Sequence, residues 1–262
     1  MSLINITKQL FNVKRFPILM GKIWTRLSET ASSKDNEENL QWLASQKQDF
    51  AQYAASLDAE LWDESLAYAE TLQKHGHEVL SQLDVTLGGG GFYPLIYFVT
   101  RYRKPTTILE TGVAAGYSSH AFLSALEKNA AQGSQGNLYS SDFPYFRIEN
   151  PEKYIGILVP ESLKSRWNLF IDGDAKNLPK IMASVNSIDL FHYDSDKRYA
   201  GREQAMQYVG PKLSDKAIVI MDDINDNRYF MEMCQAQGKA YRIFEFEGKY
   251  IGMLGDLAES NA

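Results

Sequence analysis

The stretch ILETGVAAGYSS at residues 108–119 constrains the fold more than any other part of the chain. The aliphatic and β-branched run at residues 106–109 predicts a strand that ends at Glu110. Gly112 and Gly116 follow, and then a helical pattern begins. A strand, a glycine turn and a helix N-terminus form a nucleotide-sized pocket, because glycine lets the backbone approach a ligand and the helix start offers free N–H groups. The spacing E-x-G-x-x-x-G differs from the G-x-G-x-x-G of dinucleotide-binding proteins.

Strands and helices alternate after this stretch, which predicts an α/β fold with right-handed crossovers. We expect a Rossmann-like, mostly parallel sheet of seven strands with helices on both faces. The expected strands are residues 106–110, 137–141, 167–171, 188–193, 217–221, 241–246 and 250–254, and the expected helices are residues 118–131, 177–184, 202–209 and 228–237. The last two strands are joined by a hairpin-like turn, and residues 143–166, which contain three prolines, predict an irregular insertion.

The preceding residues predict helices. We expect an N-terminal helical extension or lid at residues 1–85 and an α/β domain at residues 86–262. Within the extension, Ser33 to Asn39 is polar and predicts a linker or exposed turn. The glycines at 88–91 predict a hinge or a close contact with a ligand, and a helix is expected at residues 92–102.

The first 28 residues combine five basic residues with interleaved apolar ones and contain no acid; the basic residues are Lys8, Lys14, Arg15, Lys22 and Arg26. This pattern allows a peripheral membrane helix or an interaction arm. It also allows a helix that packs on its own domain or on a second subunit, so a homo-oligomer formed through the N-terminal helices stays open.

Composition narrows the class of protein. A net charge of −6 argues against nucleic acid as the main partner, because phosphate binding needs a basic face. The single cysteine, Cys234, cannot form an internal disulfide, so a reducing cytoplasm is expected, and the apolar residues around it predict a buried thiol. No apolar run reaches membrane-spanning length.

Acidic residues close the predicted strands or begin the loops after them, and these are Glu110, Asp142, Asp174, Asp194, Asp222 and Asp223. The carboxyl ends of parallel strands meet at one edge of the sheet, where ligands bind. One such acid is commonly a helix cap or turn residue, and loop capping stays an alternative for Asp142 and Asp174. The whole set on one edge predicts a site.

These motifs resemble the class I S-adenosylmethionine-dependent methyltransferases over residues 85–255. The chain is most similar to the group that contains the macrolide-sugar and catechol-type O-methyltransferases, through DSDKRY at residues 194–199 and IMDD at residues 220–223. The resemblance implies methyl transfer from S-adenosylmethionine to a hydroxyl of a small molecule or sugar-containing metabolite. A metal-independent methyltransferase, a catalytically silent cofactor-binding protein and, less favoured, a nicotinamide-dependent oxidoreductase are the alternatives.

The resemblance also implies roles for single residues. Glu110, Gly112 and Gly116 would line the methionine part of the cofactor, with Ser118 near its carboxylate. Asp142 would accept hydrogen bonds from the ribose, and Asp174 and Ala175 would flank the adenine.

On the acceptor side, Asp194, Asp222 and Asp223 would hold Mg²⁺, which prefers oxygen ligands and lowers the pKa of a bound hydroxyl. Lys197 stands where relatives have a lysine or histidine general base. A surface lysine paired with Asp194 or Asp196 is the alternative reading.

The N-terminal helices, the insertion at 143–166 and the glycines at 88–91 would recognise the acceptor. Five aromatic residues would form a wall around it, and these are Tyr145, Phe146, Tyr154, Tyr199 and Tyr229.

Overall fold

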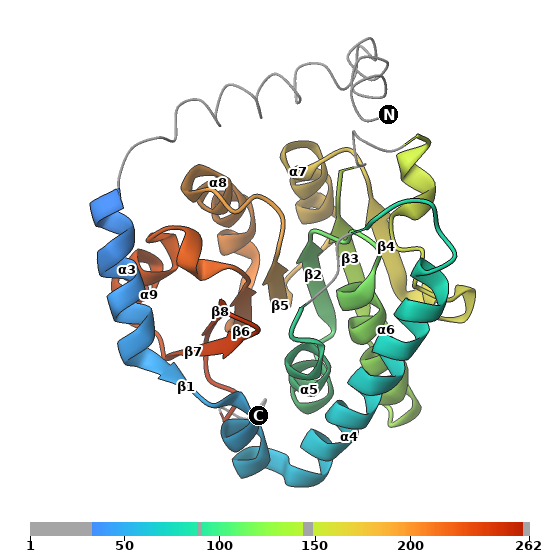
Figure 1. The fold of residues 1–262 in the computed structure, drawn as a ribbon, viewed down its shortest axis with the longest axis horizontal. Helices are drawn as coiled ribbons and strands as arrows, with labels where there is room; N and C mark the ends of the chain where they lie inside the picture. Colours follow the sequence, from blue (N-terminus) through green and yellow to red (C-terminus); the bar gives the residue numbers. More distant parts are fainter. Residues whose placement is uncertain (1–32, 88–90, 144–148, 259–262) are drawn as a thin grey trace.

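The computed structural model describes residues 33–87, 91–143 and 149–258, and its centre is one sheet with the order β1-β7-β8-β6-β5-β2-β3-β4 (Figure 1). The strands are β1 (Lys47–Gln48), β2 (Thr107–Thr111), β3 (Asn137–Ser141), β4 (Trp167–Phe170), β5 (Ile188–Tyr193), β6 (Leu213–Met221), β7 (Tyr241–Phe246) and β8 (Lys249–Leu254). All seven predicted strands are present. The sheet has an eighth strand, β1, which the sequence did not predict, because two exposed polar residues carry no strand pattern.

Strand pairing gives the sheet its functional edge. All pairs are parallel except those of β8, which runs antiparallel to both β6 and β7. The strand order reverses beside β2, which pairs with β3 on one side and with β5 on the other. Such a reversal opens a crevice at the carboxyl ends of the strands, where α/β proteins bind ligands.

Helices cover both faces of the sheet, as predicted (Figure 1). One layer contains α4 (Phe50–Leu80), α5 (Tyr93–Arg103) and α6 (Tyr117–Ala131), and the other contains α3 (Ser33–Gln46), α7 (Asp174–Ser184), α8 (Tyr199–Val209) and α9 (Tyr229–Gln237). Each layer buries its own apolar cluster against the sheet, which is the usual way to cover a parallel sheet on both sides. The buried thiol of Cys234, on α9, lies in the second cluster, as the sequence predicted.

The region before the glycine segment packs on the sheet. The predicted linker from Ser33 to Asn39 is wrong, because these residues belong to α3. The fully buried Asn39 side chain donates hydrogen bonds to the carbonyls of Ile224 and Asn227, at 3.0 and 3.1 Å. A buried amide with tertiary partners looks like a loop residue in sequence, which explains the error. The boundary near residue 85 stays a prediction.

The long helix α4 connects the β1 edge with the glycine motif. It is kinked at Asp58, whose backbone is extended. Further along, the ring of His75 lies 3.1 Å from the carbonyl oxygen of Leu158, and a Cβ at Gly76 would collide with the hydroxyl of Tyr117. The second half of α4 therefore lies against the start of α6 and the insertion.

The described part of the insertion lies on the motif loop. It contains the short 3-10 helices η1 (Pro151–Tyr154) and η2 (Glu161–Arg166) and is otherwise irregular, as predicted. The amides of Gly156 and Leu158 donate to the carbonyls of Ala114 and Ala115, at 2.9 and 3.0 Å. The insertion is thus tied to the glycine loop by backbone hydrogen bonds.

Several predictions fall outside the described residues: the basic N-terminal segment, the glycines at 88–90, and the aromatic residues Tyr145 and Phe146. In the part of the chain that the structure does describe, no helix has the length and apolar character needed to cross a membrane.

Candidate active site

The motif loop after β2 requires glycine at two positions. Gly112 and Gly116 have φ angles of 87° and 97°, which favour glycine. A Cβ at Gly112 would come within 2.2 Å of the carbonyl oxygen of Asp194, and one at Gly116 within 2.7 Å of the Cα of Gly156. The first glycine therefore allows the loop after β5 to touch the motif loop, and the second makes room for the insertion.

Glu110 is fully buried beneath this loop. Its carboxylate accepts hydrogen bonds from the hydroxyls of Ser118 (2.5 Å), Ser119 (2.6 Å) and Ser140 (2.7 Å). The hydroxyl oxygen of Ser140 also accepts from the indole N–H of Trp167, at 2.9 Å. Glu110 thus joins β2, β3 and the start of α6. In this arrangement it and Ser118 hold the loop from beneath, while their predicted contact with the cofactor stays a prediction.

Asp142 follows β3 and faces the same loop. Its Oδ2 accepts hydrogen bonds from the backbone N–H groups of Val113 and Ala114, at 3.1 and 2.7 Å, and its Oδ1 accepts from the N–H of Phe143. Burial raises the pKa of Asp142 to about 6, although these N–H groups favour the charged form. The carboxylate therefore fixes the loop and keeps further lone pairs for a ligand.

Asp174 begins α7 and lies between two strand ends. It accepts hydrogen bonds from the hydroxyls of Ser141 (2.5 Å) and Ser195 (2.6 Å). Its neighbour Ala175 is exposed. The predicted adenine contacts would lie at this helix start, which is placed at the same edge as the motif loop.

The acidic residues after β5 and β6 surround one lysine. The ammonium of Lys197 pairs with Oδ1 of Asp194, and it lies 3.0 Å from Oδ2 of Asp223. Burial lowers the pKa of Lys197, an effect that the neighbouring carboxylates oppose. The fold thus places Lys197 in contact with two of the predicted acids, Asp194 and Asp223.

The third acid, Asp222, lies against a buried histidine. Its Oδ1 is 3.6 Å from Nε2 of His192, and His192 and Lys197 hold the pKa of Asp222 below its usual range against the effect of burial. Neither ring nitrogen of His192 has a hydrogen-bond partner within the described chain. His192 is 1% exposed, as expected for a histidine within a strand.

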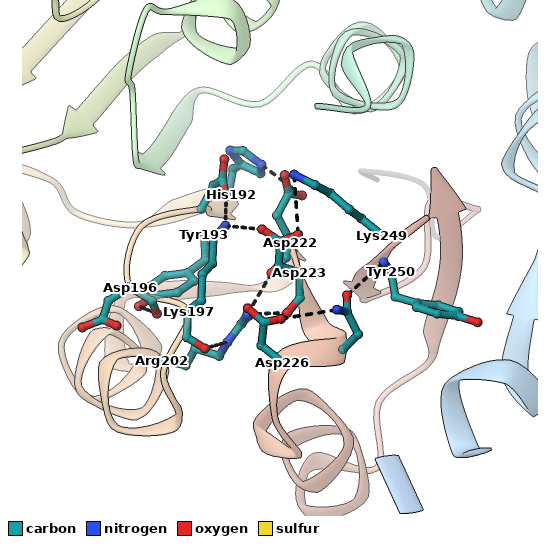
Figure 2. Close-up of polar contacts among 12 residues, drawn as sticks. His192, Tyr193, Asp196, Lys197, Arg202, Asp222, Asp223, Asp226, Lys249 and Tyr250 are labelled. Carbon is teal, nitrogen blue, oxygen red and sulfur yellow. Dashed lines mark hydrogen bonds and ion pairs between the residues drawn. The ribbon is translucent and has the colours of Figure 1, made fainter. Parts of the chain in front are cut away.

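Arg202, on α8, joins the two acidic loops (Figure 2). Arg202 is 1% exposed, and its Nη2 donates hydrogen bonds to the carbonyls of Asp222 and Asp223, both at 2.9 Å. Its Nε donates to the carbonyl of Lys197 at 3.4 Å, and Nδ2 of Asn227 donates to the same carbonyl at 2.6 Å. Sequence reasoning missed Arg202 and Asn227, because a partner that is a backbone carbonyl leaves no trace in the sequence.

Sequence reasoning also missed Lys249. This residue begins β8, and its ammonium reaches back to Oδ1 of Asp223 at 3.7 Å (Figure 2). The only signal was its place in the predicted turn between the last two strands. Asp223 itself has a φ of 53°, which is rare for a residue with a side chain, and its carboxylate lies between two lysines.

The carboxylates of Asp194, Asp222 and Asp223 follow the adjacent strands β5 and β6 and are the kind of oxygen ligand that Mg²⁺ prefers. As arranged, the described residues include no group of three acid, histidine or cysteine side chains that could hold a metal ion. The ammonium of Lys197, which pairs with Asp194 and Asp223, shows that a cation is stabilised there. The oxygens therefore fit a divalent cation only if Lys197 withdraws.

The predicted aromatic wall is divided. Tyr199 and Tyr229 meet edge to face, with ring centroids 5.1 Å apart, close to the acidic loops in sequence. Tyr154 packs in a separate apolar cluster with Leu158 and Tyr117. Of the three members that the structure describes, Tyr199 and Tyr229 stay candidates for contact with an acceptor at the acidic loops.

Residues 109–224 match the model of a family described as "Methyltransferase domain". A comparison with the sequences of curated proteins gives no match.

Solved structures share the fold. A protein from Staphylococcus aureus with the provisional name caffeoyl-CoA O-methyltransferase aligns over 72% of this chain and 92% of its own, with 16% identity and a TM-score of 0.53. The O-methyltransferase TomG from Streptomyces achromogenes, in complex with SAM, aligns over 71% and 89%, with 16% identity and a TM-score of 0.52. The SAH-bound methyltransferase PaMTH1 from Podospora anserina aligns over 76% and 97%, with 15% identity and a TM-score of 0.50. Residues 109–224 thus match a methyltransferase domain, and the solved structures of methyltransferases share the fold of this chain.

Proposed function

We propose that the protein transfers a methyl group from S-adenosylmethionine to a hydroxyl oxygen of a small molecule or sugar-containing metabolite. The observation that carries this proposal is the contact between Gly112 and the carbonyl of Asp194. It brings the loop that would hold the donor against the loop whose carboxylates would hold the acceptor. Methyl transfer by in-line attack depends mainly on such positioning of the two reactants.

The donor half is formed by residues 112–116, Asp142 and the start of α7. S-adenosylmethionine supplies an electrophilic methyl group when it is bound. The backbone at Gly112 and Gly116 would line the methionine part, Asp142 would accept hydrogen bonds from the ribose, and Asp174 with Ala175 would flank the adenine. Glu110 and Ser118 keep the loop and the helix start in place. The TomG structure is a complex with SAM and the PaMTH1 structure contains bound SAH, which supports this donor.

The acceptor half is formed by Asp194, Asp222, Asp223 and Lys197. The three carboxylates would hold Mg²⁺, which lowers the pKa of an acceptor hydroxyl when bound. Lys197 takes the hydroxyl proton at its Nζ once it is deprotonated, and burial favours that state by lowering its pKa. Arg202 donates hydrogen bonds to carbonyls of the loops after β5 and β6 and so fixes the positions of the acids on these loops relative to one another.

Calorimetric titration with S-adenosylmethionine tests the donor half. The wild-type protein should bind below millimolar concentrations, and Asp142→Asn should bind on the order of tenfold more weakly, a loss of about 1.4 kcal/mol. Asp215→Asn, at an exposed acid near the start of β6, is the matched control and should bind as the wild type does. No binding below millimolar concentrations would refute the cofactor assignment.

A transfer assay with isotope-labelled methyl donor and a set of hydroxylated acceptors tests the reaction. The label should appear on an acceptor oxygen, and a binding protein without turnover would leave it on the donor. Asp194→Ala assayed with EDTA should lose turnover. Unchanged turnover under those conditions would remove both Asp194 and the metal from the proposal.

A further inference from the structure

Lys197 is held in place by its backbone as well as by its charge. Asn227 and Arg202 both donate to its carbonyl, at 2.6 and 3.4 Å. From this fixed point the side chain extends between the loops after β5 and β6, where its ammonium contacts Asp194 and Asp223. The two side chains are 35% and 17% exposed, so the ion pairs are shielded from water on part of their surface.

This position is the one that a divalent cation would need. Adjacent carboxylates repel each other, and a cation between them relieves that repulsion. Here the ammonium relieves it, and it uses one oxygen of Asp194 and one of Asp223 to do so. The ammonium and a metal ion would therefore compete for the same two carboxylate oxygens.

We propose that Lys197 is a built-in occupant of the carboxylate cluster, which a divalent cation must displace in order to bind. The inference rests on the proposed function for its metal-binding carboxylates. The affinity for the metal is then set by the cost of moving Lys197 as well as by the acids.

Lys249 provides the matched control. Its ammonium also faces Asp223, but at 3.7 Å, and its side chain is 53% exposed. It adds a positive charge near the cluster without lying between two carboxylates. Because the Lys249 side chain is more than half exposed, water screens its ion pair with Asp223, which therefore contributes little. Removal of Lys249 therefore reports the effect of charge alone.

The experiment is calorimetric titration of Mg²⁺ into four proteins without S-adenosylmethionine: wild type, Lys197→Gln, Lys197→Arg and Lys249→Gln. Circular dichroism shows that each variant is folded. We expect Lys197→Gln to bind Mg²⁺ at least about tenfold more tightly than the wild type. Lys197→Arg, which keeps a cation in place, should bind as weakly as the wild type. Lys249→Gln should change the affinity by less than about fivefold.

Three results would overturn the inference. The first is equal or weaker Mg²⁺ binding by Lys197→Gln, and the second is an equal gain in both glutamine variants, which would show a long-range charge effect. The third is the absence of Mg²⁺ binding in every protein. Titration of the same samples with S-adenosylmethionine keeps the two claims separate: donor binding and methyl transfer without the affinity gain would leave the proposed function intact and remove only the role of Lys197.

Discussion

Substitution of Glu110 by glutamine tests the role of the buried carboxylate under the motif loop. The wild-type carboxylate accepts three hydroxyl donors and is fully buried. Glutamine has nearly the same volume, but its amide replaces one of the two oxygens with a donor. If its oxygen keeps the contact with Ser118, the hydroxyls of Ser119 and Ser140 lose their acceptor.

The two hydroxyls differ in their alternatives. Ser119 lies in the first turn of α6 and can donate to a backbone carbonyl of the preceding turn. Ser140 lies in β3, is fully buried and already accepts from Trp167, and its hydroxyl donates to Glu110 in the structure. A buried polar group without a partner costs about 1–3 kcal/mol, and the loss of charge on the remaining hydrogen bonds adds to this. We expect Glu110→Gln to lose about 2–4 kcal/mol of unfolding free energy.

Urea unfolding measures this loss as a lower midpoint at unchanged slope. Because Glu110 joins β2, β3 and α6 beneath the loop, affinity for S-adenosylmethionine should also fall, on the order of tenfold in calorimetry. Ser119→Ala removes one donor, leaves the charge in place, and should cost about 1 kcal/mol. A Glu110→Gln protein with wild-type stability and wild-type donor affinity would refute the view that this carboxylate organises the loop.

Three other predictions concern single contacts. Gly112→Ala should lose at least about 2 kcal/mol of unfolding free energy and nearly all turnover, because its Cβ would meet the carbonyl of Asp194. The control Gly133→Ala has a similar φ of 89° but open space around its Cβ, and should cost about 1 kcal/mol. Equal losses in the two variants would contradict the clash. Arg202→Met should lose about 3 kcal/mol of unfolding free energy and lower kcat, because the Arg202 guanidinium donates hydrogen bonds to carbonyls of the acidic loops. Affinity for S-adenosylmethionine should stay unchanged, and an equal loss of that affinity would argue against this role. Burial and the nearby His75 lower the pKa of His120 from 6.5 to about 4, so the free energy of unfolding should be full above pH 6.5 and fall by up to about 3 kcal/mol as the pH drops toward 4. Urea titrations at several pH values should show a smaller loss in His120→Gln. The same pH dependence in both proteins would refute the assignment.

The sheet was predictable because its strands are aliphatic runs that end at acids. The sequence bounds of β3 and β5 match the structure, and the hairpin turn at Glu247 and Gly248 has the positive φ angles that such turns need. The strand β1 was not predictable, since Lys47 and Gln48 become a strand only by pairing with β7. Pairing between distant segments leaves no local pattern in two residues.

The site was predictable as a set of residues at one edge, but the direction of each side chain was not. Glu110 ends a strand as predicted, yet its carboxylate lies beneath the loop among three serines. Arg202 could not be foreseen, because it acts through carbonyls that every residue has. Periodicity places a residue along an element, whereas burial and partners depend on the tertiary packing.

The absence of a side chain at Gly112 has a consequence for the evolution of substrate choice. The backbone of Asp194, after β5, lies against Gly112, so main-chain contact sets the separation between the two loops that we propose to hold donor and acceptor. Side-chain substitutions at these positions cannot adjust that separation. A change of acceptor must come from the segments that lie over the edge, such as the insertion tied to Ala114 and Ala115. In the proposed reaction, the choice of acceptor would therefore change through these covering segments while the distance between the two loops stays constant.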